Sequence, residues 1–445
     1  MQKIKEKIVW ILTGIIFLGI PFVTSFFLPI FVLDIIQYIL ESSLSLIATQ
    51  QIIEALSTLF YKDKVYLSTR DIKLQKITVI IPAYLPNEVN IIIDTINHYS
   101  STMYDGEWNA ILTYNTPIEL EIEKEIKILC EKFDWFECVK VEGSTSKAQN
   151  INYVLDNCES SLGDIIGIFD ADHHPQSDSF DRVNVWLGVE GYDYVQGRCM
   201  IRDEDFGLVE SLVKYNFDIM YGVHHKARRI MWDFAVFGGT NGYWKTEIIK
   251  DIKFDENFLT EDIDSTLRTI LQGHKGIYDR KLISTEESPP NFNDLCKQRV
   301  RWAQGWFEVT YTYTHKILFS KKIKFRSKIV LFFLLPWREF FSYLNMWGFP
   351  VMVAKIHNNG FYFLSNYFSI ITSIYCFLLY PIVALCIHIS SNEEWFKRKK
   401  LLIAVCLLNF VYQWWERVVS IYAHSRSFLR LNNWVTTQRK KNLKF

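Results

Sequence analysis

Residues 163–172 read GDIIGIFDAD, in which the continuous apolar run IIGIF is followed by the two acidic residues of DAD. Such a run is typical of a strand buried on both faces. The same reasoning predicts strands at 77–84 (ITVIIPAY), 109–114 (NAILTY) and 138–141, and helices at 119–132 and 147–157. Alternating strands and helices indicate an α/β domain with a parallel sheet and crossover helices. In such sheets ligands bind beyond the carboxyl ends of the strands, so acidic residues placed there are candidate site residues.

The composition of the whole chain excludes several classes of protein. Its 445 residues include 49 basic and 49 acidic ones, and this balance argues against a nucleic-acid binder. The apolar share of 49% argues against disorder. The apolar residues are segregated, because Ile8–Leu33 and Phe361–Ile387 contain no charged residue. About 20 such residues cross a bilayer, so we expect a membrane protein with the lipid bilayer as a partner.

We expect three parts along the chain. Residues 1–61 form N-terminal transmembrane or interfacial helices, with one span at about 8–30 and a weaker helix to about 60. Residues 62–327 carry most of the charges and form the α/β domain. Residues 328–445 form C-terminal interfacial and transmembrane helices with a basic tail, and candidate spans lie at 329–354, 361–387 and 401–423. The eight cysteines form no C-x-x-C pair, which argues against a zinc ribbon and fits a reducing cytosol.

Asp170-Ala171-Asp172 forms the first candidate site. Positions i and i+2 of an extended backbone face the same way, so the two carboxylates repel unless a cation lies between them. Mg²⁺ or Mn²⁺ prefers such oxygen ligands. Either His173 or His174 can assist Mn²⁺, although a solvent-facing or supporting role also fits both. The alternative for the whole motif is a solvated acidic loop.

Two further motifs lie where helical patterns begin. Lys147 stands near the start of a helix in the segment 144–152 (STSKAQNIN), and such a position suits an anion such as pyrophosphate. Ordinary capping by Ser144 or Ser146 is the alternative. Asp262, in the segment TED at 260–262, can act as a general base toward a hydroxyl. Its alternative role is to complement the helix dipole.

The last two motifs suit a sugar with a phosphate leaving group. Gln298, Arg301 and Trp302 stand at i, i+3 and i+4, hence on one helix face. The indole can stack on a sugar ring, the amide can bind hydroxyls, and the guanidinium can neutralise developing charge. The alternative is an amphipathic surface helix. The glycines of 237–242 (FGGTNG) allow close approach of the backbone, or form a plain turn.

Together and in this order, the motifs resemble the membrane-embedded family 2 glycosyltransferases, the group that contains cellulose, chitin and hyaluronan synthases. The resemblance covers roughly residues 75–310, including PAYLPNE at 82–88, SKAQNIN at 146–152, DAD, TED and QRVRW. It implies an α/β GT-A nucleotide-sugar-binding domain, cytosolic and inserted between N- and C-terminal transmembrane helices, with Mg²⁺ or Mn²⁺ as cofactor. The implied site residues are Asp262 and Glu261 for catalysis; Tyr84, Glu88, Asn115, Lys147, Asn150, Asp170 and Asp172 for the nucleotide-sugar; Asp170 and Asp172 for the metal; and Gly239, Thr240, Gln298, Arg301 and Trp302 for the acceptor and diphosphate.

One segment departs from the family pattern. The family carries an acidic, Ser-containing loop that contacts uracil after the second strand, whereas residues 113–117 read TYNTP and contain no acid. Asn115 is the candidate to replace the acidic side chain as the partner of the base.

The mechanism implied by the resemblance is a single inverting displacement. Asp262 deprotonates the acceptor hydroxyl, and the metal, together with Arg301 and Lys147, stabilises the departing diphosphate.

We therefore expect an enzyme of the inner or plasma membrane that builds a β-linked polysaccharide from a UDP-sugar. UDP-glucose is the first candidate donor, and extrusion of the product across the membrane is a further hypothesis. The alternatives are a non-processive enzyme that glycosylates a membrane lipid, and an inactive scaffold or polysaccharide-binding protein. The charge pairs at 338–339 and 416–417 have two interpretations. They line a channel for the polymer within the membrane, or they lie at the membrane interface within an aromatic belt. The tail WVTTQR at 434–439 resembles the family's cytosolic gating segment, and the basic clusters at 397–400 and 439–441 leave the topology open.

Overall fold

The computed structural model describes residues 2–60, 73–202, 207–360, 367–391, 399–429 and 431. The chain divides into two compact units. The apolar unit comprises Met1–Tyr61, Cys296–Thr314 and Ile329–Val435, and the α/β unit comprises Lys62–Leu295 and His315–Lys328. The helix α12 (Phe292–Phe319) contributes residues to both units. The predicted gating segment at 434–439 and the basic cluster at 439–441 lie outside the described residues.

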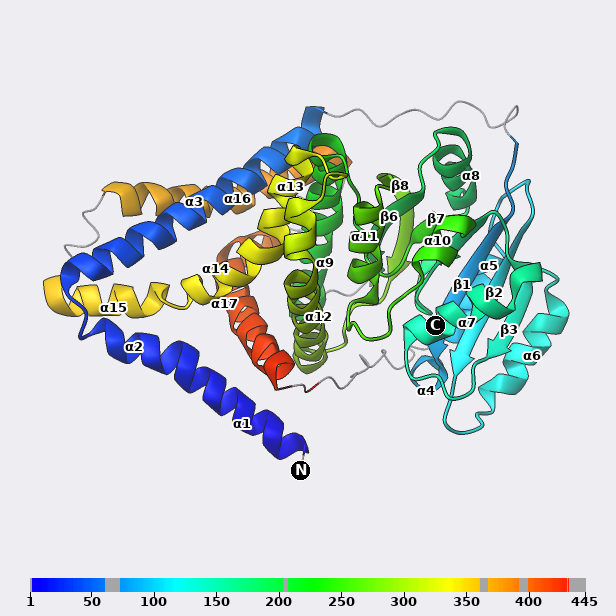
Figure 1. The fold of residues 1–445 in the computed structure, drawn as a ribbon, viewed down its shortest axis with the longest axis horizontal. Helices are drawn as coiled ribbons and strands as arrows, with labels where there is room; N and C mark the ends of the chain where they lie inside the picture. The colour runs from blue at the N-terminus through cyan, green and yellow to red at the C-terminus, as the bar shows by residue number, and fades with distance from the viewer. Residues whose placement is uncertain are drawn as a thin grey trace. The chain divides into compact units, whose positions relative to one another are not determined.

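The α/β unit is built on an eight-stranded sheet of order β3-β2-β1-β4-β7-β6-β8-β5 within the described residues (Figure 1). The strands are β1 (Ile77–Tyr84), β2 (Trp108–Asn115), β3 (Phe136–Lys140), β4 (Ile165–Ile168), β5 (His174–Pro175), β6 (Tyr194–Ile201), β7 (Gly242–Lys245) and β8 (Gly276–Glu286). The predicted α/β class is confirmed, and β3, β2, β1 and β4 run parallel as expected.

The sheet as a whole is mixed, so the parallel pairing expected from the sequence holds for only part of it. β7 runs antiparallel to both of its neighbours, β4 and β6. It has only four residues and begins at the last glycine of the segment 237–242, so it lacks the long β-branched run by which β1 was recognised. The short strand β5 also pairs antiparallel, with β8.

Helices and short helical turns connect the strands. They are α4 (Leu85–Glu88), α5 (Ile92–Tyr99), α6 (Ile122–Lys132), α7 (Lys147–Asn157), η3 (Glu159–Ser161), α8 (Ser179–Asn184), η4 (Val185–Val189), α9 (Leu208–Ile219), η5 (Met220–His225), η6 (Arg228–Trp232), α10 (Thr246–Ile252) and α11 (Glu261–Gln272). α7 begins at Lys147 because the Ser146 hydroxyl accepts a hydrogen bond from the Gln149 amide at 3.2 Å. α11 ends where Gly273 adopts φ +95°, a left-handed conformation that glycine reaches at little cost.

The core of the α/β unit lies on the face of β1 and β2 that α5 and α6 cover. Val79, Ile81, Leu112 and Ile96 are fully buried there. Burial of each such side chain contributes roughly 1.5–3 kcal/mol to folding. This core holds the carboxyl ends of β1, β2 and β4 in a fixed register, and the residues that follow those ends form the candidate site.

The apolar unit contains three helical segments that are long and apolar enough to cross a membrane, among the described residues: Ile4–Ser25, Ile30–Phe60 and Tyr367–Ile387. The first combines α1 (Gln2–Gly14), η1 (Ile15–Gly19) and α2 (Ile20–Ser25), the second is α3 (Ile30–Phe60), and the third lies in α16 (Tyr367–Ser391). The single span expected at about 8–30 thus ends at Ser25. Pro29 explains this ending, because a proline ring clashes with the carbonyl four residues earlier in a continuing helix.

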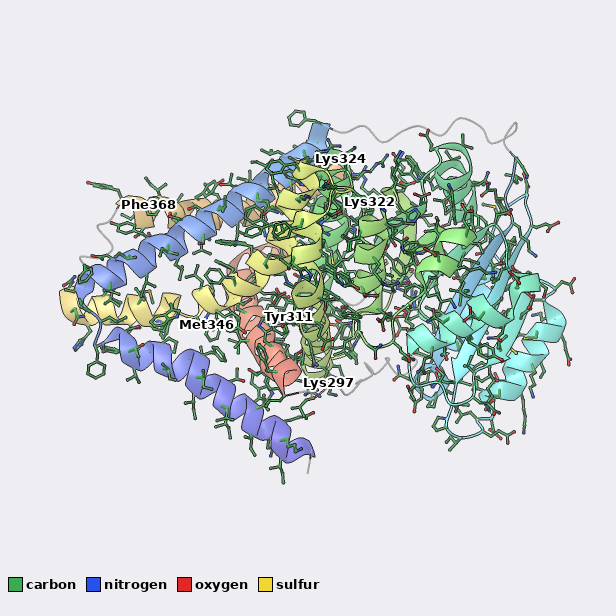
Figure 2. The ribbon with its side chains drawn as sticks, viewed as in Figure 1. Lys297, Tyr311, Lys322, Lys324, Met346 and Phe368 are labelled. Atoms are coloured by element: carbon green, nitrogen blue, oxygen red, sulfur yellow. The ribbon has the colours of Figure 1, made fainter. Side chains whose placement is uncertain are left out.

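α3 and α16 pack side by side, and polar side chains form hydrogen bonds between them (Figure 1). Gln37 donates to the Ser369 hydroxyl at 2.7 Å, and the Tyr375 hydroxyl donates to Thr49 at 2.9 Å. Phe368, at the start of α16, contacts the ring of Tyr38 with centroids 5.9 Å apart (Figure 2). Interhelical hydrogen bonds of this kind help hold helices together where water is absent.

The stretch expected to span at 329–354 is not among the candidate spans in the described part of the chain. It is divided among α13 (Phe325–Phe332), η7 (Phe333–Trp337), α14 (Arg338–Asn345) and α15 (Gly348–Asn359). Pro336 lies inside η7, and a turn at Met346 and Trp347 separates α14 from α15. The last expected span falls within α17 (Lys399–Phe428), which is helical throughout.

Candidate active site

Lys147 is the centre of the candidate site. It is the first residue of α7, and its ammonium donates to Asp170 Oδ1 at 2.5 Å and to the Gly239 carbonyl at 2.6 Å. Asp170 follows β4, and Gly239 belongs to the segment 237–242 that leads into β7. One side chain thus joins three motifs that are far apart in the sequence.

Three carboxylates act on this ammonium. Burial alone would lower the pKa of Lys147, but the negative charges of Asp170, Glu261 and Asp262 outweigh burial and leave the pKa raised. Lys147 is therefore protonated at neutral pH. The charged residues of DAD and TED must lie close to one another for this effect, which places both motifs at one site.

Asp262 lies against Gly239. The glycine has φ +89°, and a Cβ added to it would stand 3.0 Å from Asp262 Oδ2. Any side chain at this position would be strained by the backbone conformation and would also press on the carboxylate. Asp262 is half-buried on the first turn of α11, while Glu261 beside it is 6% exposed. α11 is tied to the glycine-containing segment because the Phe237 amide donates to Thr266 Oγ1 at 3.0 Å.

Thr240 and Gln196 hold the glycine-containing segment in place. Thr240 Oγ1 accepts a hydrogen bond from the Asp170 amide at 3.2 Å. Gln196, fully buried on β6, accepts from the Gly238 amide at 2.8 Å and donates to the Thr240 carbonyl at 3.0 Å. The sequence reasoning did not identify Gln196, because it lies in a strand and matches no motif.

Asp172 is the more buried of the two predicted metal ligands. It is 1% exposed, and its Oδ2 accepts from the Glu287 amide at 3.3 Å. Arg202 donates to the Asp172 carbonyl at 3.1 Å and so fixes the backbone of the loop. Arg202 was also missed, since nothing in its spacing distinguishes it from a surface arginine.

The residues present fit Mg²⁺ or Mn²⁺. Carboxylate oxygens are the ligands that these hard cations prefer. Asp170 keeps 36% of its side chain exposed, which leaves the carboxylate accessible to a ligand. The carboxylates of Asp170, Glu261 and Asp262 outnumber the Lys147 ammonium that they surround, and this excess of negative charge favours a further cation. The predicted metal role of Asp170 and Asp172 stays a prediction.

The predicted nucleotide contacts lie along the ends of β1 and β2. Tyr84 and Asn115 are register partners in the β1–β2 ladder, and Tyr84 is 40% exposed. The Asn115 amide is engaged at both ends, since its Nδ2 donates to the Ser144 carbonyl at 2.9 Å and its Oδ1 accepts from Asn150 Nδ2 at 3.0 Å. Glu88, on α4, is 6% exposed. These contacts fix the orientation of the Asn115 amide and leave one N–H donor and one oxygen lone pair for a further partner.

Gln298, Arg301 and Trp302 belong to the part of α12 that clusters with the apolar unit. Gln298 Oε1 is buried without a hydrogen-bond partner among the described residues. The Arg299 guanidinium lies 4.5 Å over the Trp302 ring, a cation–π contact that fixes the indole. The predicted contacts of these three residues with acceptor and diphosphate stay predictions.

A family model matches the second part of the α/β domain and part of the apolar helices that follow it. The sequence model described as "Glycosyl transferase family group 2" matches residues 165–388, just over half of the 445 residues. Probable glucomannan 4-beta-mannosyltransferase 7 of Oryza sativa subsp. japonica is 27% identical over 193 residues, 43% of this chain and 32% of the relative. Probable glucomannan 4-beta-mannosyltransferase 11 of the same plant is 29% identical over 179 residues, 40% of this chain and 30% of the relative. The chain thus matches less than a third of the length of either rice protein.

Comparison with solved structures identifies the fold. The mannosyltransferase PcManGT from Pyrobaculum calidifontis, in complex with GDP-Man and Mn²⁺, superposes with a TM-score of 0.57 and 15% sequence identity. The superposition covers 90% of this chain and 100% of PcManGT. The expected GT-A fold, flanked by N- and C-terminal candidate membrane helices, is confirmed.

Proposed function

This chain belongs to glycosyl transferase family group 2, and we propose that it is an inverting, metal-dependent hexosyltransferase that extends a β-linked polysaccharide from a nucleotide-diphosphate sugar. One observation carries the proposal. Lys147 bridges Asp170 and the Gly239 carbonyl, while Gly239 stands against Asp262. A cation, a metal-type carboxylate and a base-type carboxylate therefore meet at the edge of the sheet where ligands bind in α/β proteins.

The proposed chemistry assigns one task to each of these groups. Asp262 accepts the proton of the acceptor hydroxyl as its oxygen attacks the anomeric carbon, a contribution of roughly 10²–10⁴-fold. Lys147 stays protonated and neutralises charge on the leaving diphosphate. Mg²⁺ or Mn²⁺, held by Asp170 and Asp172, would supply a Lewis acid for the same diphosphate. A single displacement needs no carboxylate nucleophile, in contrast to retaining glycoside hydrolysis.

Different observations support two different sugar donors, GDP-mannose and UDP-glucose. The names of both rice relatives describe mannosyltransferases, and PcManGT was solved with GDP-Man, which supports GDP-mannose. The pairing of TED with QRVRW resembles cellulose synthases, which supports UDP-glucose. The absence of an acid in 113–117, where the family carries an acidic loop that contacts uracil, weakens the case for uracil. We therefore place GDP-mannose first and UDP-glucose second.

Ionisable and aromatic side chains of the apolar unit support a polymeric product. Glu339 pairs with His424 at 2.6 Å between Oε2 and Nε2, and the Arg338 guanidinium lies 4.8 Å over the Trp306 ring. Trp337 Nε1 is buried with no hydrogen-bond partner among the residues that the structure describes. Ionisable groups packed among apolar helices usually face one another or a polar path. We propose that they line the path of the growing chain, and a lipid acceptor is the second candidate.

A donor panel with product sizing tests the proposal. Membranes that contain the full chain are incubated with radiolabelled GDP-mannose or UDP-glucose and with Mn²⁺ or Mg²⁺, and the products are separated by size and by extraction into organic solvent. Incorporation from one donor into a large, solvent-insoluble product supports a polysaccharide synthase. A small, solvent-extractable product would favour the lipid acceptor, and no incorporation from any donor tested, with the chain folded, would overturn the enzymatic assignment.

The path for the polymer has its own test. We expect Arg338→Gln and Glu416→Gln to shorten the polymer, because each removes a charge from one of the two pairs, 338–339 and 416–417, that we propose to line the path. Arg326→Gln is the matched control, since Arg326 is 49% exposed and pairs with Asp233 at 2.8 Å. Normal polymer length and export in both path variants would remove the channel from the proposal.

A further inference from the structure

Three side chains with different ligand atoms meet beside the predicted Mg²⁺ or Mn²⁺ site. They are His173, Cys199 and Glu286, and their ligand atoms all lie within 4.8 Å of one another. The side chains of His173 and Cys199 are fully buried, and the Glu286 side chain is 16% exposed. The chemistry proposed above uses none of the three.

The sheet provides a rigid frame for this cluster. Cys199 on β6 is the register partner of Ser284 on β8, and Glu286 follows Ser284 by two positions, so the three side chains share one face of the sheet. His173 is attached to the same frame, because its Nδ1 lies 3.0 Å from Ser284 Oγ. This contact directs the other ring nitrogen, Nε2, toward Cys199 and Glu286.

The separation of His173 from Glu286 fits a shared metal ion better than a hydrogen bond. His173 Nε2 is buried with no hydrogen-bond partner in the described part of the chain, and its separation from Glu286 Oε2 is 3.6 Å. A hydrogen bond between nitrogen and oxygen is about 2.7–3.2 Å long. Two metal bonds of about 2.0–2.2 Å at a tetrahedral angle hold their ligand atoms about 3.3–3.6 Å apart.

We propose that His173, Cys199 and Glu286 bind a zinc ion, distinct from the Mg²⁺ or Mn²⁺ at Asp170 and Asp172. Imidazole, thiolate and carboxylate are the ligands that Zn²⁺ takes in proteins, whereas Mg²⁺ avoids sulfur. A hydrogen bond on the second imidazole nitrogen, as Ser284 provides here, is a common feature of zinc-bound histidine. The zinc would join the loop after Asp172 to β6 and β8. The proposal does not depend on the donor or on the polymer.

Metal analysis of the purified full chain tests the site. The chain is purified in detergent, loaded with Zn²⁺, dialysed, and analysed for bound metal by mass spectrometry. We expect about one tightly bound zinc per wild-type chain and a loss of most of it in Cys199→Ala. Cys158→Ala, which removes a half-buried thiol outside the cluster, is the matched control and is expected to keep the zinc. Asp170→Asn is also expected to keep it, because Asp170 belongs to the other cation site.

A spectrum of the wild type keeps the proposal testable if Cys199→Ala does not fold. Co²⁺ replaces Zn²⁺ in such sites, and a thiolate ligand then gives a charge-transfer absorption band. We expect this band in wild type and in Cys158→Ala loaded with Co²⁺. Absence of the band in folded wild type, or equal zinc content in Cys199→Ala and wild type, would overturn the zinc site. Loss of zinc from Asp170→Asn would instead assign the ion to the carboxylate site and would likewise overturn the proposal.

Discussion

Replacement of Gly239 by alanine isolates the contact on which the proposed mechanism rests. The new Cβ would stand 3.0 Å from Asp262 Oδ2, at the limit of real contacts, so the carboxylate must move by a few tenths of an ångström. The backbone at φ +89° adds strain, because an L-residue in the left-handed region costs about 1–2 kcal/mol. Since misplacement of a catalytic group by about 1 Å can cost 10²-fold, we expect a roughly ten- to hundredfold fall in kcat for sugar transfer.

A second glycine separates the two effects. Gly191 also has a positive φ, +75°, but a Cβ added there would meet nothing within 4 Å. Gly191→Ala should therefore lose a similar amount of stability and keep its transfer rate. The assay is the initial rate of labelled sugar transfer in membranes, normalised to folded protein and measured for both variants. If Gly239→Ala transfers sugar within twofold of Gly191→Ala, Asp262 does not depend on its contact with Gly239, and the geometric argument fails.

Three further predictions follow from the same contacts. Lys147→Met should lower kcat/KM for the nucleotide-sugar about ten- to hundredfold, because a hydrogen bond to a charged group contributes about 1.5–3 kcal/mol and this one is made to the leaving diphosphate. Lys250→Met, which breaks an exposed pair with Glu159, should leave the kinetics unchanged. Chelation of divalent cations should abolish transfer and Mn²⁺ should restore it; transfer that persists at full rate in chelator would remove the metal from the mechanism. Burial tends to raise the pKa of Glu123, but hydrogen bonds from the Leu120 amide, Lys140 and Tyr114 outweigh burial and leave the pKa lowered. The ionised carboxylate therefore stabilises the fold fully above about pH 4.3, the ordinary pKa of Glu. This stabilisation is lost as the pH falls through the lowered pKa. Thermal unfolding of Glu123→Gln should show a weaker acid dependence than wild type, and equal acid dependence would contradict the assignment.

The sequence predicted those elements best that carry a strong local signal. β1 and α7 have the predicted bounds, because a β-branched run defines the strand and Ser146 caps the helix. β7 escaped notice because four residues that pair antiparallel carry no usable periodicity. Pro29 marks the break before α3 in the sequence. The prediction nevertheless ran the first span to about residue 30, because the apolar composition is uniform across the break.

The candidate site shows a similar division. DAD, TED and Lys147 were identified from residue type and spacing, yet the contact of Gly239 with Asp262 joins segments more than twenty residues apart and needs the fold to be seen. Gln196 and Arg202 organise the site from β6 and from the residue after it, and a strand position gives no spacing to recognise. His173 was recognised only as a possible helper of Mn²⁺, because Cys199 and Glu286 are distant in the sequence.

Asp262 is the residue on which the mechanism depends most directly. The decisive measurement compares sugar transfer by Asp262→Asn and wild type under saturating donor, with donor binding measured in parallel. The proposed mechanism predicts a fall in transfer of roughly 10²–10⁴-fold with donor binding retained, because the amide keeps the shape of the side chain but cannot accept the proton. Full turnover by Asp262→Asn would contradict the assignment of the base and, with it, the central chemical claim.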